Sequence, residues 1–423
     1  MNTYIGQRAF SGGRGSAFAF SLDQRMKHLF LIGKSGTGKS SLIKTLILSD
    51  IWSGRGCALL DPHGDLAEDI LFHIPRDRVR DVVLFEPSHR ENPASINLLD
   101  PPEDPDMKAV VADGIISILH GHWGDSWGPR LELTLRHCIL ALLDFPEDTT
   151  LLGVGRLLTD ESYRRKVVSR VENPITRAYF ENQFAKYNTR FLLEVSTPIL
   201  NRLEKITSNP LMRNIIGIPK STINIRRIMR DNQILIANLN QALIGKSYAD
   251  LLGSFLLGSI ELSALERSTI PEKEREPFFI YIDELSGFSS AVIESMISQI
   301  RKFGCGLTLA TQTLANHSDK LQTSLLSCGS IVAHRVGGRD ADMLDLEFDR
   351  EVPPEAFTAL EPFQAYIKIP DGSLPFRSFM DKPPSYYRRR RPAQIRKASR
   401  AQYTRPRAVV EAKIDRWMQD RPA

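Results

Sequence analysis

The chain has 423 residues, of which 42% are hydrophobic and 25% charged, and its formal net charge is +5. This composition is typical of globular proteins and excludes wholesale disorder and the fibrous classes. The length corresponds to two or three domains. The charge is unevenly placed, because residues 382–423 hold 13 Lys and Arg against 3 Asp and Glu, while the remainder is mildly acidic.

The sequence shows no clear secretion or membrane signal. The first residues lack the continuous apolar core of a signal peptide. The most apolar stretch, residues 251–260, is interrupted by Gly and Ser and is much shorter than the roughly 20 residues that span a bilayer. We therefore expect a cytoplasmic protein without a transmembrane segment. Four widely separated cysteines without a C-x-x-C pair argue against a disulfide framework or a zinc site and predict small buried side chains.

Short apolar runs typical of buried strands alternate with helical patterns in two parts of the chain. The residues up to about Gly15 are Gly-rich and polar and are assigned no element. Helical spacing is found at 38–52, at about 247–267 and at about 289–303. The alternation predicts an α/β fold with a parallel, doubly wound sheet. Strands are expected at 28–33, 56–61, 81–87, 233–239, 277–284, 306–312, 329–336 and 364–369.

A long helical segment separates the two alternating parts. From about 105 to 222 the apolar residues recur at helical spacing and strand signals are almost absent. The predicted organisation is a nucleotide-binding domain in two pieces, with an all-helical insertion between them and a basic, flexible tail after them. The corresponding boundaries are 1–104, 105–222, 223–381 and 382–423.

The most specific motif is GKSGTGKS at 33–40, between an apolar strand and a helix. It matches the phosphate-binding loop, in which glycines let backbone N–H groups surround phosphates at the positive end of the next helix. Lys39 is expected to reach the β- and γ-phosphates, and the Ser40 hydroxyl to bind Mg²⁺. A simple Gly-rich turn is the alternative, but a turn rarely needs this Lys-Ser pair. The predicted nucleotide-binding residues are Gly33, Lys34, Ser35, Gly36, Thr37, Gly38, Lys39, Ser40 and Ser41.

Polar residues at the ends of two of the predicted strands complete this site. Asp283 would hold Mg²⁺ through water, and Glu284 would polarise an attacking water. Gln312 ends the next strand and is placed to sense the γ-phosphate, because the carboxyl ends of adjacent parallel strands share one crevice. Alone, the Asp-Glu pair also fits a strand that meets a helix cap, and Gln312 fits an ordinary polar strand end.

Other features are less specific. Arg301 and Lys302 end a helix, where a cation either stabilises transition-state charge or simply complements the helix dipole. The DPHGD sequence at 61–65 either approaches the nucleotide or forms a capped turn. HGHWGDSWGPR at 120–130 is interpreted as a contact loop or a packed aromatic corner. The basic tail, with Arg388 to Arg391 beside two tyrosines, fits nucleic-acid binding, but a solvated tail or a docking segment for an acidic protein fits equally well.

Together these motifs resemble a known family. HLFLIGKSGTGKSSLIKTLILSDIWSGRGCALLDPHGDLAEDIL, YIDE followed by SQIRKFGCGLTLATQTL, and HRVGGRDADML are similar to sequences of the type IV secretion coupling ATPases, the conjugative DNA-transfer ATPases of the TraD/TraG type. These belong to the FtsK/HerA superfamily of phosphate-loop DNA pumps. The resemblance covers most of residues 20–370 and includes the helical insertion.

The resemblance implies a RecA-like domain in a ring, usually of six subunits, that hydrolyses ATP with Mg²⁺ at subunit interfaces and moves DNA through a central channel. It assigns catalytic roles to Lys39, Glu284 and Gln312, metal binding to Ser40 and Asp283, and the arginine finger of a neighbouring subunit to Arg301. A relaxase or secretion channel is the implied partner, which could hold the protein peripherally at the inner membrane. Many coupling proteins begin with membrane helices, whereas this chain starts almost directly at the motor domain.

Two other functions remain open at this stage. A HerA-like helicase or translocase would use the same motor with a nuclease partner in repair or phage defence. A nucleotide-dependent adaptor would recruit a substrate without sustained turnover, although it would not need a water-orienting Glu284. Ring size, direction of movement and the preference for single- or double-stranded DNA are not determined by these motifs.

Overall fold

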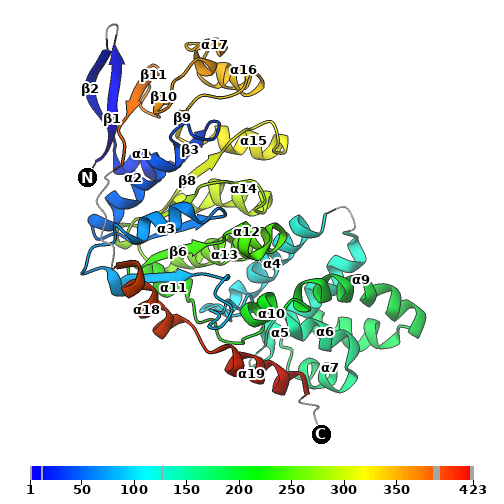
Figure 1. The fold of residues 1–423 in the computed structure, drawn as a ribbon. Coiled ribbons are helices and arrows are strands. Elements are labelled where there is room, and N and C mark those ends of the chain that lie inside the picture. The colour runs from blue at the N-terminus through cyan, green and yellow to red at the C-terminus, as the bar shows by residue number, and fades with distance from the viewer. Residues whose placement is uncertain (1, 11–12, 125–126, 148, 384–390, 420–423) are drawn as a thin grey trace. The chain divides into compact units, whose positions relative to one another are not determined.

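The computed structural model describes residues 2–10, 13–124, 127–147, 149–383 and 391–419 (Figure 1). The chain forms two compact units. The sheet unit contains residues 1–85, 225–253 and 263–399, and the helical unit contains residues 86–224, 254–262 and 400–423. The chain therefore enters and leaves the helical unit between parts of the sheet unit, as an insertion does.

A single mixed sheet forms the centre of the sheet unit, with strand order β2-β1-β11-β10-β9-β3-β8-β7-β4-β6-β5. The pairs from β9 to β5 in this order are parallel, and those from β2 to β9 are antiparallel. The prediction of an α/β fold with a mostly parallel sheet is confirmed. The strands are β1 (Thr3–Phe10), β2 (Gly13–Phe20), β3 (Leu29–Ile32), β4 (Cys57–Asp61), β5 (Val82–Phe85), β6 (Ile234–Asn238), β7 (Phe278–Ile282), β8 (Cys305–Thr311), β9 (Ser330–Ala333), β10 (Gln364–Lys368) and β11 (Phe376–Met380).

Every strand expected from an apolar run is present, from β3 to β10 in chain order. The parallel strands are buried at each position. Burial on both faces explains why they appear in the sequence as continuous apolar runs. In β7, Phe279 and Tyr281 on one face belong to the same core cluster as α2 and α3, and Phe278 and Ile280 on the other face are buried as well.

Three antiparallel strands were not expected: β1, β2 and β11. The Gly-rich opening segment forms most of the β1–β2 hairpin, and β1 pairs in turn with β11. Register shifts near Gly6 break the pairing pattern, and only Phe18 and Phe20 of β2 alternate clearly into the core. Glycine is uncommon in strand interiors, so composition alone conceals β1 and β2, the latter being the edge strand of the sheet.

Helices α2 and α3 lie across one face of the sheet (Figure 1), where Leu42, Ile43 and Leu46 of α2 join Leu66 and Ile70 of α3 in the main core cluster. Helix α13 continues from the sheet unit into residues of the helical unit. The helices and short turns of the sheet unit are α1 (Leu22–Met26), α2 (Lys39–Trp52), α3 (Asp65–Leu71), η1 (Val79–Asp81), α11 (Ile225–Arg230), α12 (Gln241–Ile244), α13 (Lys246–Glu266), η6 (Arg267–Thr269), η7 (Glu272–Glu274), α14 (Ser290–Gln299), η8 (Ile300–Phe303), α15 (Asp319–Leu326), α16 (Gly338–Glu347) and α17 (Pro354–Thr358).

The helical unit contains no strand among its described residues. The expected all-helical insertion is thus confirmed. All four cysteines of the chain are buried free thiols, and one of them, Cys138, lies in this unit. Its elements are η2 (Pro105–Met107), α4 (Lys108–Trp123), α5 (Pro129–Asp144), α6 (Leu152–Thr159), α7 (Glu161–Val168), α8 (Pro174–Ala178), the π-helical turn η4 (Tyr179–Gln183), η5 (Phe184–Lys186), α9 (Thr189–Thr207) and α10 (Pro210–Ile216).

The C-terminal segment differs from the flexible tail that its charge suggested. Its described part forms two helices, α18 (Arg391–Tyr403) and α19 (Arg407–Gln419). In the sheet unit, the Ser399 hydroxyl of α18 accepts a hydrogen bond from the Leu84 N–H at 2.9 Å. In the helical unit, Val410 and Ile414 of α19 pack against Ile218. These few apolar anchors outweigh the high charge. Residues 384–390, with two tyrosines and three of the four consecutive arginines, lie outside the described residues.

Within the described residues one helical segment, Lys246–Thr269, is long and apolar enough to cross a membrane by length and composition. An 18-residue window within it has a mean hydropathy of 1.2, and 78% of that window is buried inside the protein. The core helix of a globular protein passes the same test, so this observation is weak evidence for a membrane span. The segment includes the apolar stretch that had appeared too interrupted to span a bilayer.

A buried ion pair joins α1 to α2 beneath the sheet. Arg25, 2% exposed, donates to both carboxylate oxygens of the fully buried Asp50, at 2.9 and 2.6 Å. Arg25 also donates to the Tyr281 hydroxyl of β7 at 2.6 Å and lies over the Phe279 ring, 3.9 Å from its centroid. Burial raises the pKa of Tyr281 well above its ordinary value. The protonated Tyr281 hydroxyl in turn donates to Asp50. The network fixes α2 against β7.

We predict that Arg25→Met lowers the free energy of unfolding by about 3–5 kcal/mol, because it leaves the Asp50 charge buried without its main partner. The measurement is urea-induced unfolding followed by circular dichroism. Lys27→Met is the matched control, since the half-buried Lys27 pairs with the exposed Asp23 in a contact that is worth at most about 1 kcal/mol. An Arg25→Met/Asp50→Leu double variant should recover much of the loss. Equal stabilities of Arg25→Met and Lys27→Met would contradict the role assigned to the network.

Candidate nucleotide-binding site

The loop between β3 and α2 has the backbone geometry that its glycines allow. Gly36 and Gly38 adopt φ angles of +75° and +117°, a region that side chains disfavour. Gly33 is required by space, since a Cβ there would lie 2.6 Å from His334 Cβ. The loop leads into the 14-residue helix α2, whose first N–H groups have no partner within the helix. This arrangement is an anion-binding site.

The loop is held in place by the neighbouring strands. The Gly33 N–H donates to the Thr311 carbonyl of β8 at 3.3 Å, and the Lys34 N–H donates to the Arg335 carbonyl after β9 at 2.8 Å. The Lys39 ammonium folds back and donates to the carbonyl of Gly33 and, at 3.1 Å, to that of Lys34. Burial lowers the pKa of Lys39, although the charges of Glu284 and Asp283 oppose that shift. An incoming anion would replace the two carbonyls as the partner of the lysine.

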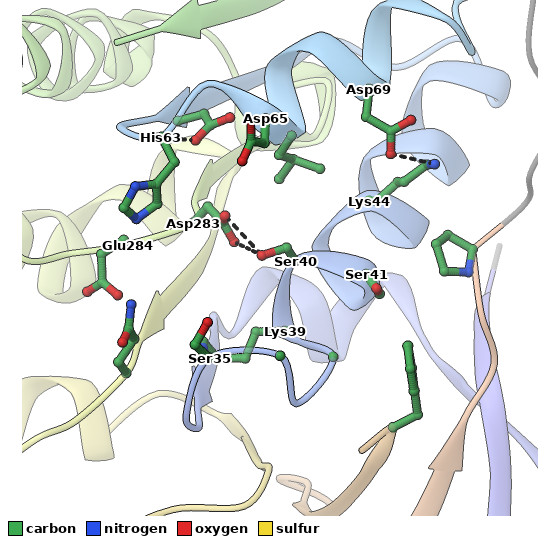
Figure 2. Close-up of a pocket in the computed structure, with 17 residues that line it drawn as sticks. Ser35, Lys39, Ser40, Ser41, Lys44, His63, Asp65, Asp69, Asp283 and Glu284 are labelled. Carbon is green, nitrogen blue, oxygen red and sulfur yellow. Dashed lines mark hydrogen bonds and ion pairs between the residues drawn. The ribbon is translucent and has the colours of Figure 1, made fainter. Parts of the chain in front are cut away.

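The first residue after β7 faces the start of α2. The Ser40 hydroxyl lies 2.9 and 3.0 Å from the two carboxylate oxygens of Asp283 (Figure 2). Burial raises the pKa of Asp283 to about 6, and the charge of Asp61 adds to the rise. A hydroxyl and a partly desolvated carboxylate offer the hard oxygen ligands that Mg²⁺ prefers. Ser40 and Asp283 therefore fit a magnesium ion, which would displace any proton from the carboxylate.

Glu284 is buried and held by specific contacts. Its Oε1 atom accepts hydrogen bonds from the Ser286 N–H and the Thr311 hydroxyl, both at 3.2 Å. The Thr311 hydroxyl also lies 3.0 Å from His317 Nε2. Burial lowers the pKa of His317, so its ring is neutral at pH 7. The sequence had indicated Glu284 but not Thr311 or His317, which no motif marks.

These residues line one cavity of about 630 Å³ in the sheet unit. Lys39, Ser40, Asp283, Glu284 and the exposed Gln312 all contribute to its wall, so the structure brings together the residues predicted from separate motifs. The reason is the sheet order, which places the carboxyl ends of β3, β8, β7 and β4 side by side. Of the loop residues predicted to bind nucleotide, Ser35, Gly36, Gly38 and Ser41 also line the cavity, while Gly33, Lys34 and Thr37 form its backbone support.

The DPHGD segment combines both interpretations made from sequence. The Asp61 carboxylate accepts hydrogen bonds from the N–H groups of His63 and Ala67, both at 2.9 Å, and so stabilises the turn and the start of α3. Asp61, His63 and Asp65 also line the cavity, and Figure 2 shows His63 and Asp65 across from Ser40. The turn is thus structural and adjacent to the candidate metal ligands.

Sequence reasoning missed several residues of the cavity. Lys44, one turn after Ser40 on α2, forms an ion pair of 2.7 Å with Asp69 of α3 (Figure 2). Phe363 and Pro383 line the wall as well. The only signal for Lys44 was its position on the helix face that carries Ser40, and Phe363 and Pro383 come from the antiparallel part of the sheet, where no motif occurs.

Phe363 adopts an unusual backbone conformation, with φ at +64°. Both of its backbone groups are used, since its N–H donates to the Thr37 carbonyl at 2.9 Å and its carbonyl accepts from the Met380 N–H at 2.7 Å. A Cβ on Gly38 would lie 3.3 Å from the Phe363 ring. A non-glycine residue in this region costs about 1 kcal/mol or more and tends to occur at functional sites. The phosphate loop itself therefore holds an aromatic ring against the cavity.

Arg301 does not reach this cavity within its own chain. It is exposed in η8, just before β8, whereas Gln312 follows the other end of that strand. A strand of seven residues places the two about 20 Å apart. Another arginine, Arg335, lies beside the phosphate loop through its backbone carbonyl.

The aromatic loop after α4 belongs to the helical unit. His120 and Trp127 stack with ring centroids 4.9 Å apart, and Trp123 lies 5.5 Å from Trp127. The Trp127 indole donates to Glu132 at 2.5 Å. Of the two interpretations made from the sequence, the packed aromatic corner is the one that these contacts support.

The fold and the loop geometry define a RecA-like phosphate-loop domain with a helical insertion. Solved structures of the plasmid coupling protein TrwB are similar. The complex with the GTP analogue GDPNP is 17% identical over 92% of this chain and 96% of that one, with a TM-score of 0.66. The complex with ADP and Mg²⁺ is 17% identical over 93% and 97%, with a TM-score of 0.66.

VirB4 of Thermoanaerobacter pseudethanolicus is also similar, at 11% identity over 90% of this chain and 96% of that one, with a TM-score of 0.60. No protein-family model and no curated protein sequence matches the chain. The resemblance to the coupling ATPases found in the sequence is therefore confirmed at the level of the fold, over nearly the whole chain.

Proposed function

We propose that the protein is a Mg²⁺-dependent ATPase that works as an oligomeric DNA-translocating motor, in the manner of a type IV secretion or conjugative coupling protein. The observation that carries this proposal is the convergence of Lys39, Ser40, Asp283, Glu284 and Gln312 on one cavity. A protein that only binds nucleotide does not need a buried carboxylate oriented for water activation. The fold shared with TrwB, whose structures contain ADP with Mg²⁺ and nucleotide analogues, supports the same substrate.

The phosphates of ATP would lie on the loop, with the Lys39 ammonium moving from the carbonyls of Gly33 and Lys34 to the β- and γ-phosphates. Ser40 and Asp283 would hold Mg²⁺, which neutralises phosphate charge when bound. Glu284 would accept a proton from the attacking water, and Gln312 would contact the γ-phosphate. The Thr311 and Ser286 contacts fix the direction in which the Glu284 carboxylate points.

The experiment that tests this proposal measures steady-state ATP hydrolysis by the purified protein, with and without single- and double-stranded DNA at low salt. We expect DNA to stimulate hydrolysis, and Glu284→Gln to abolish it while Mg²⁺·ATP still binds, because the amide keeps the size of the carboxylate but cannot accept the proton. A hydrolysis rate that does not change when DNA is added would contradict the proposal of a DNA-translocating motor. Activity that survives in Glu284→Gln would contradict the assigned base, and biological function in that variant would favour an adaptor.

The position of Arg301 supports an oligomer, with six subunits in the ring as the proposed number. This exposed arginine is too far from the cavity of its own chain, so a catalytic role requires the site of a neighbouring subunit. An arginine supplied across an interface stabilises transition-state charge on the phosphates. In this arrangement each site is completed only on assembly. DNA and a relaxase or secretion channel are the proposed partners.

A mixing experiment tests this assignment. We predict that Arg301→Ala binds ATP but loses about 10³-fold in turnover, whereas Lys302→Ala, an exposed neighbour, remains active. Lys39→Ala should fail to bind nucleotide. Mixed rings of Arg301→Ala and Lys39→Ala contain some interfaces with both native residues, so the mixture should regain ATPase activity that neither variant has alone. Full ATPase activity of Arg301→Ala, or no recovery of activity on mixing the two variants, would contradict the assignment of Arg301 as an arginine finger.

The Phe363 end of the cavity is the proposed place for the base of ATP. Phe363 lies beside Gly38 of the loop, and Phe363 and Pro383 offer the apolar surface on which a purine stacks. Stacking of a base on an aromatic side chain is worth about 1–3 kcal/mol. The strained but well-anchored backbone of Phe363 keeps the ring in place before ATP arrives.

We predict that Phe363→Ala weakens ATP binding about tenfold, while binding of inorganic tripolyphosphate is unchanged because that ligand has no base. Both affinities are measured by calorimetry with Mg²⁺ present. Phe363→Trp should retain ATP affinity. If Phe363→Ala weakened both ligands equally, the residue would support the loop rather than contact the base.

A further inference from the structure

The helical unit contains a second cavity, of about 620 Å³, which shares no residue with the nucleotide cavity. One wall is the loop 217–222 that follows α10. The other wall is formed by side chains of the C-terminal segment: Gln402, Arg405, Val409, Lys413 and Trp417. We call this cavity the α19 groove. It is built by the segment that appeared from its composition to be a basic tail.

The groove carries a strong positive charge. Lys220, Arg405 and Lys413 are exposed in its wall, and no Asp or Glu occurs among the described residues that line it. Glu411, on the same helix, is already neutralised by Arg407 at 2.8 Å and accepts from the Asn214 amide at 3.1 Å. A concave surface with three cations and no compensating carboxylate attracts anions.

An aromatic ring stands beside these cations. The Trp417 indole is fixed by Arg156, whose guanidinium carbon lies 4.9 Å from the ring centroid and whose Nη1 donates to the Trp417 carbonyl at 2.8 Å. Tyr163 meets the same indole edge-on, with centroids 6.0 Å apart. Val409, 48% exposed, adds an apolar surface. A rigid aromatic and aliphatic wall next to cations is the combination on which nucleic-acid bases stack while phosphates are neutralised.

Part of the backbone of the groove is already hydrogen-bonded within the protein. The N–H groups of Thr222 and Ile223 donate to the Ser95 carbonyl at 3.1 and 3.3 Å. The Pro219 carbonyl accepts from the Asn97 side-chain amide at 2.7 Å. A peptide that binds by strand addition needs free backbone groups, and these groups of the loop are already used. A duplex does not fit this site either, because its bases stay stacked inside the helix and are not available to contact Trp417.

We propose that the α19 groove binds single-stranded nucleic acid, with phosphates on Lys220, Arg405 and Lys413 and a base on Trp417. Its walls hold mostly charged and apolar groups, so recognition is sequence-tolerant. The site goes beyond the proposed ATPase, because binding there requires neither ATP nor turnover. It would give the helical unit its own contact with a strand.

The test is fluorescence anisotropy of a labelled oligo-dT with the full chain in the absence of nucleotide, over a series of salt concentrations. Lys220→Glu and Lys413→Glu should each weaken binding several-fold. Each should also reduce the slope of log affinity against log salt by about 0.7, the contribution of one phosphate contact in a single strand. Lys205→Glu is the matched control: it reverses an exposed charge on α9 of the same unit but outside the groove, and should leave affinity and slope unchanged.

Trp417→Leu separates stacking from charge. We expect about tenfold weaker binding at every salt concentration with an unchanged slope, whereas Trp417→Phe, which keeps an aromatic ring, retains most of the affinity. Thermal unfolding shows whether either variant disturbs α19. If it does, the two lysine variants still decide the question.

Two results would overturn the proposal. One is unchanged oligo-dT affinity in both Lys220→Glu and Lys413→Glu. The other is binding of polyglutamate that depends on these lysines while oligo-dT binding does not, which would assign the groove to an acidic protein. Both are read without ATP, so they are independent of whether DNA stimulates hydrolysis.

Discussion

The hydrogen bonds between the Ser40 hydroxyl and the Asp283 carboxylate connect residues separated by 243 positions in the sequence, and the candidate site depends on this contact. It exists because β3 and β7 end at the same edge of a parallel sheet, with β8 between them and β4 beside β7. The same edge brings the Gly33 N–H to the Thr311 carbonyl and the Thr311 hydroxyl to Glu284. The loop at 33–40 and the Glu284 carboxylate are thus coupled through the end of β8.

Support for this edge comes from beneath the sheet. The network of Arg25, Asp50 and Tyr281 ties α2, which follows the loop at 33–40, to β7, which ends just before Asp283. Asp50 lies near the far end of α2, so the pair resists rotation of that helix about its axis. A buried ion pair is costly to form and is strongly directional once formed. It is therefore suited to fixing the angle between a helix and a strand more than to adding stability.

Part of the basic C-terminal segment is an ordered, packed element of the helical unit. Val410 and Ile414 are enough to seat α19 against Ile218, while its cations remain on the surface. Lys220 comes from a loop far away in the sequence, and only folding places it beside Arg405 and Lys413. The positive groove is therefore a property of the tertiary structure, although its charge was already evident in the composition.

The sequence alone determined the phosphate loop, the Asp283–Glu284 pair, the strands from β3 to β10 and the helical insertion. It could do so because each of these has a local signature: glycines at positions of unusual φ, or apolar runs that are buried on both faces. It did not indicate β1, β2 and β11, whose burial alternates weakly, or the helices α18 and α19, whose charge resembles that of a disordered tail. No sequence motif indicated the remaining residues of the two sites, which are Phe363, Thr311, His317 and the groove lysines. Their proximity depends on strand order and helix packing, and only the tertiary structure decides which distant residues meet.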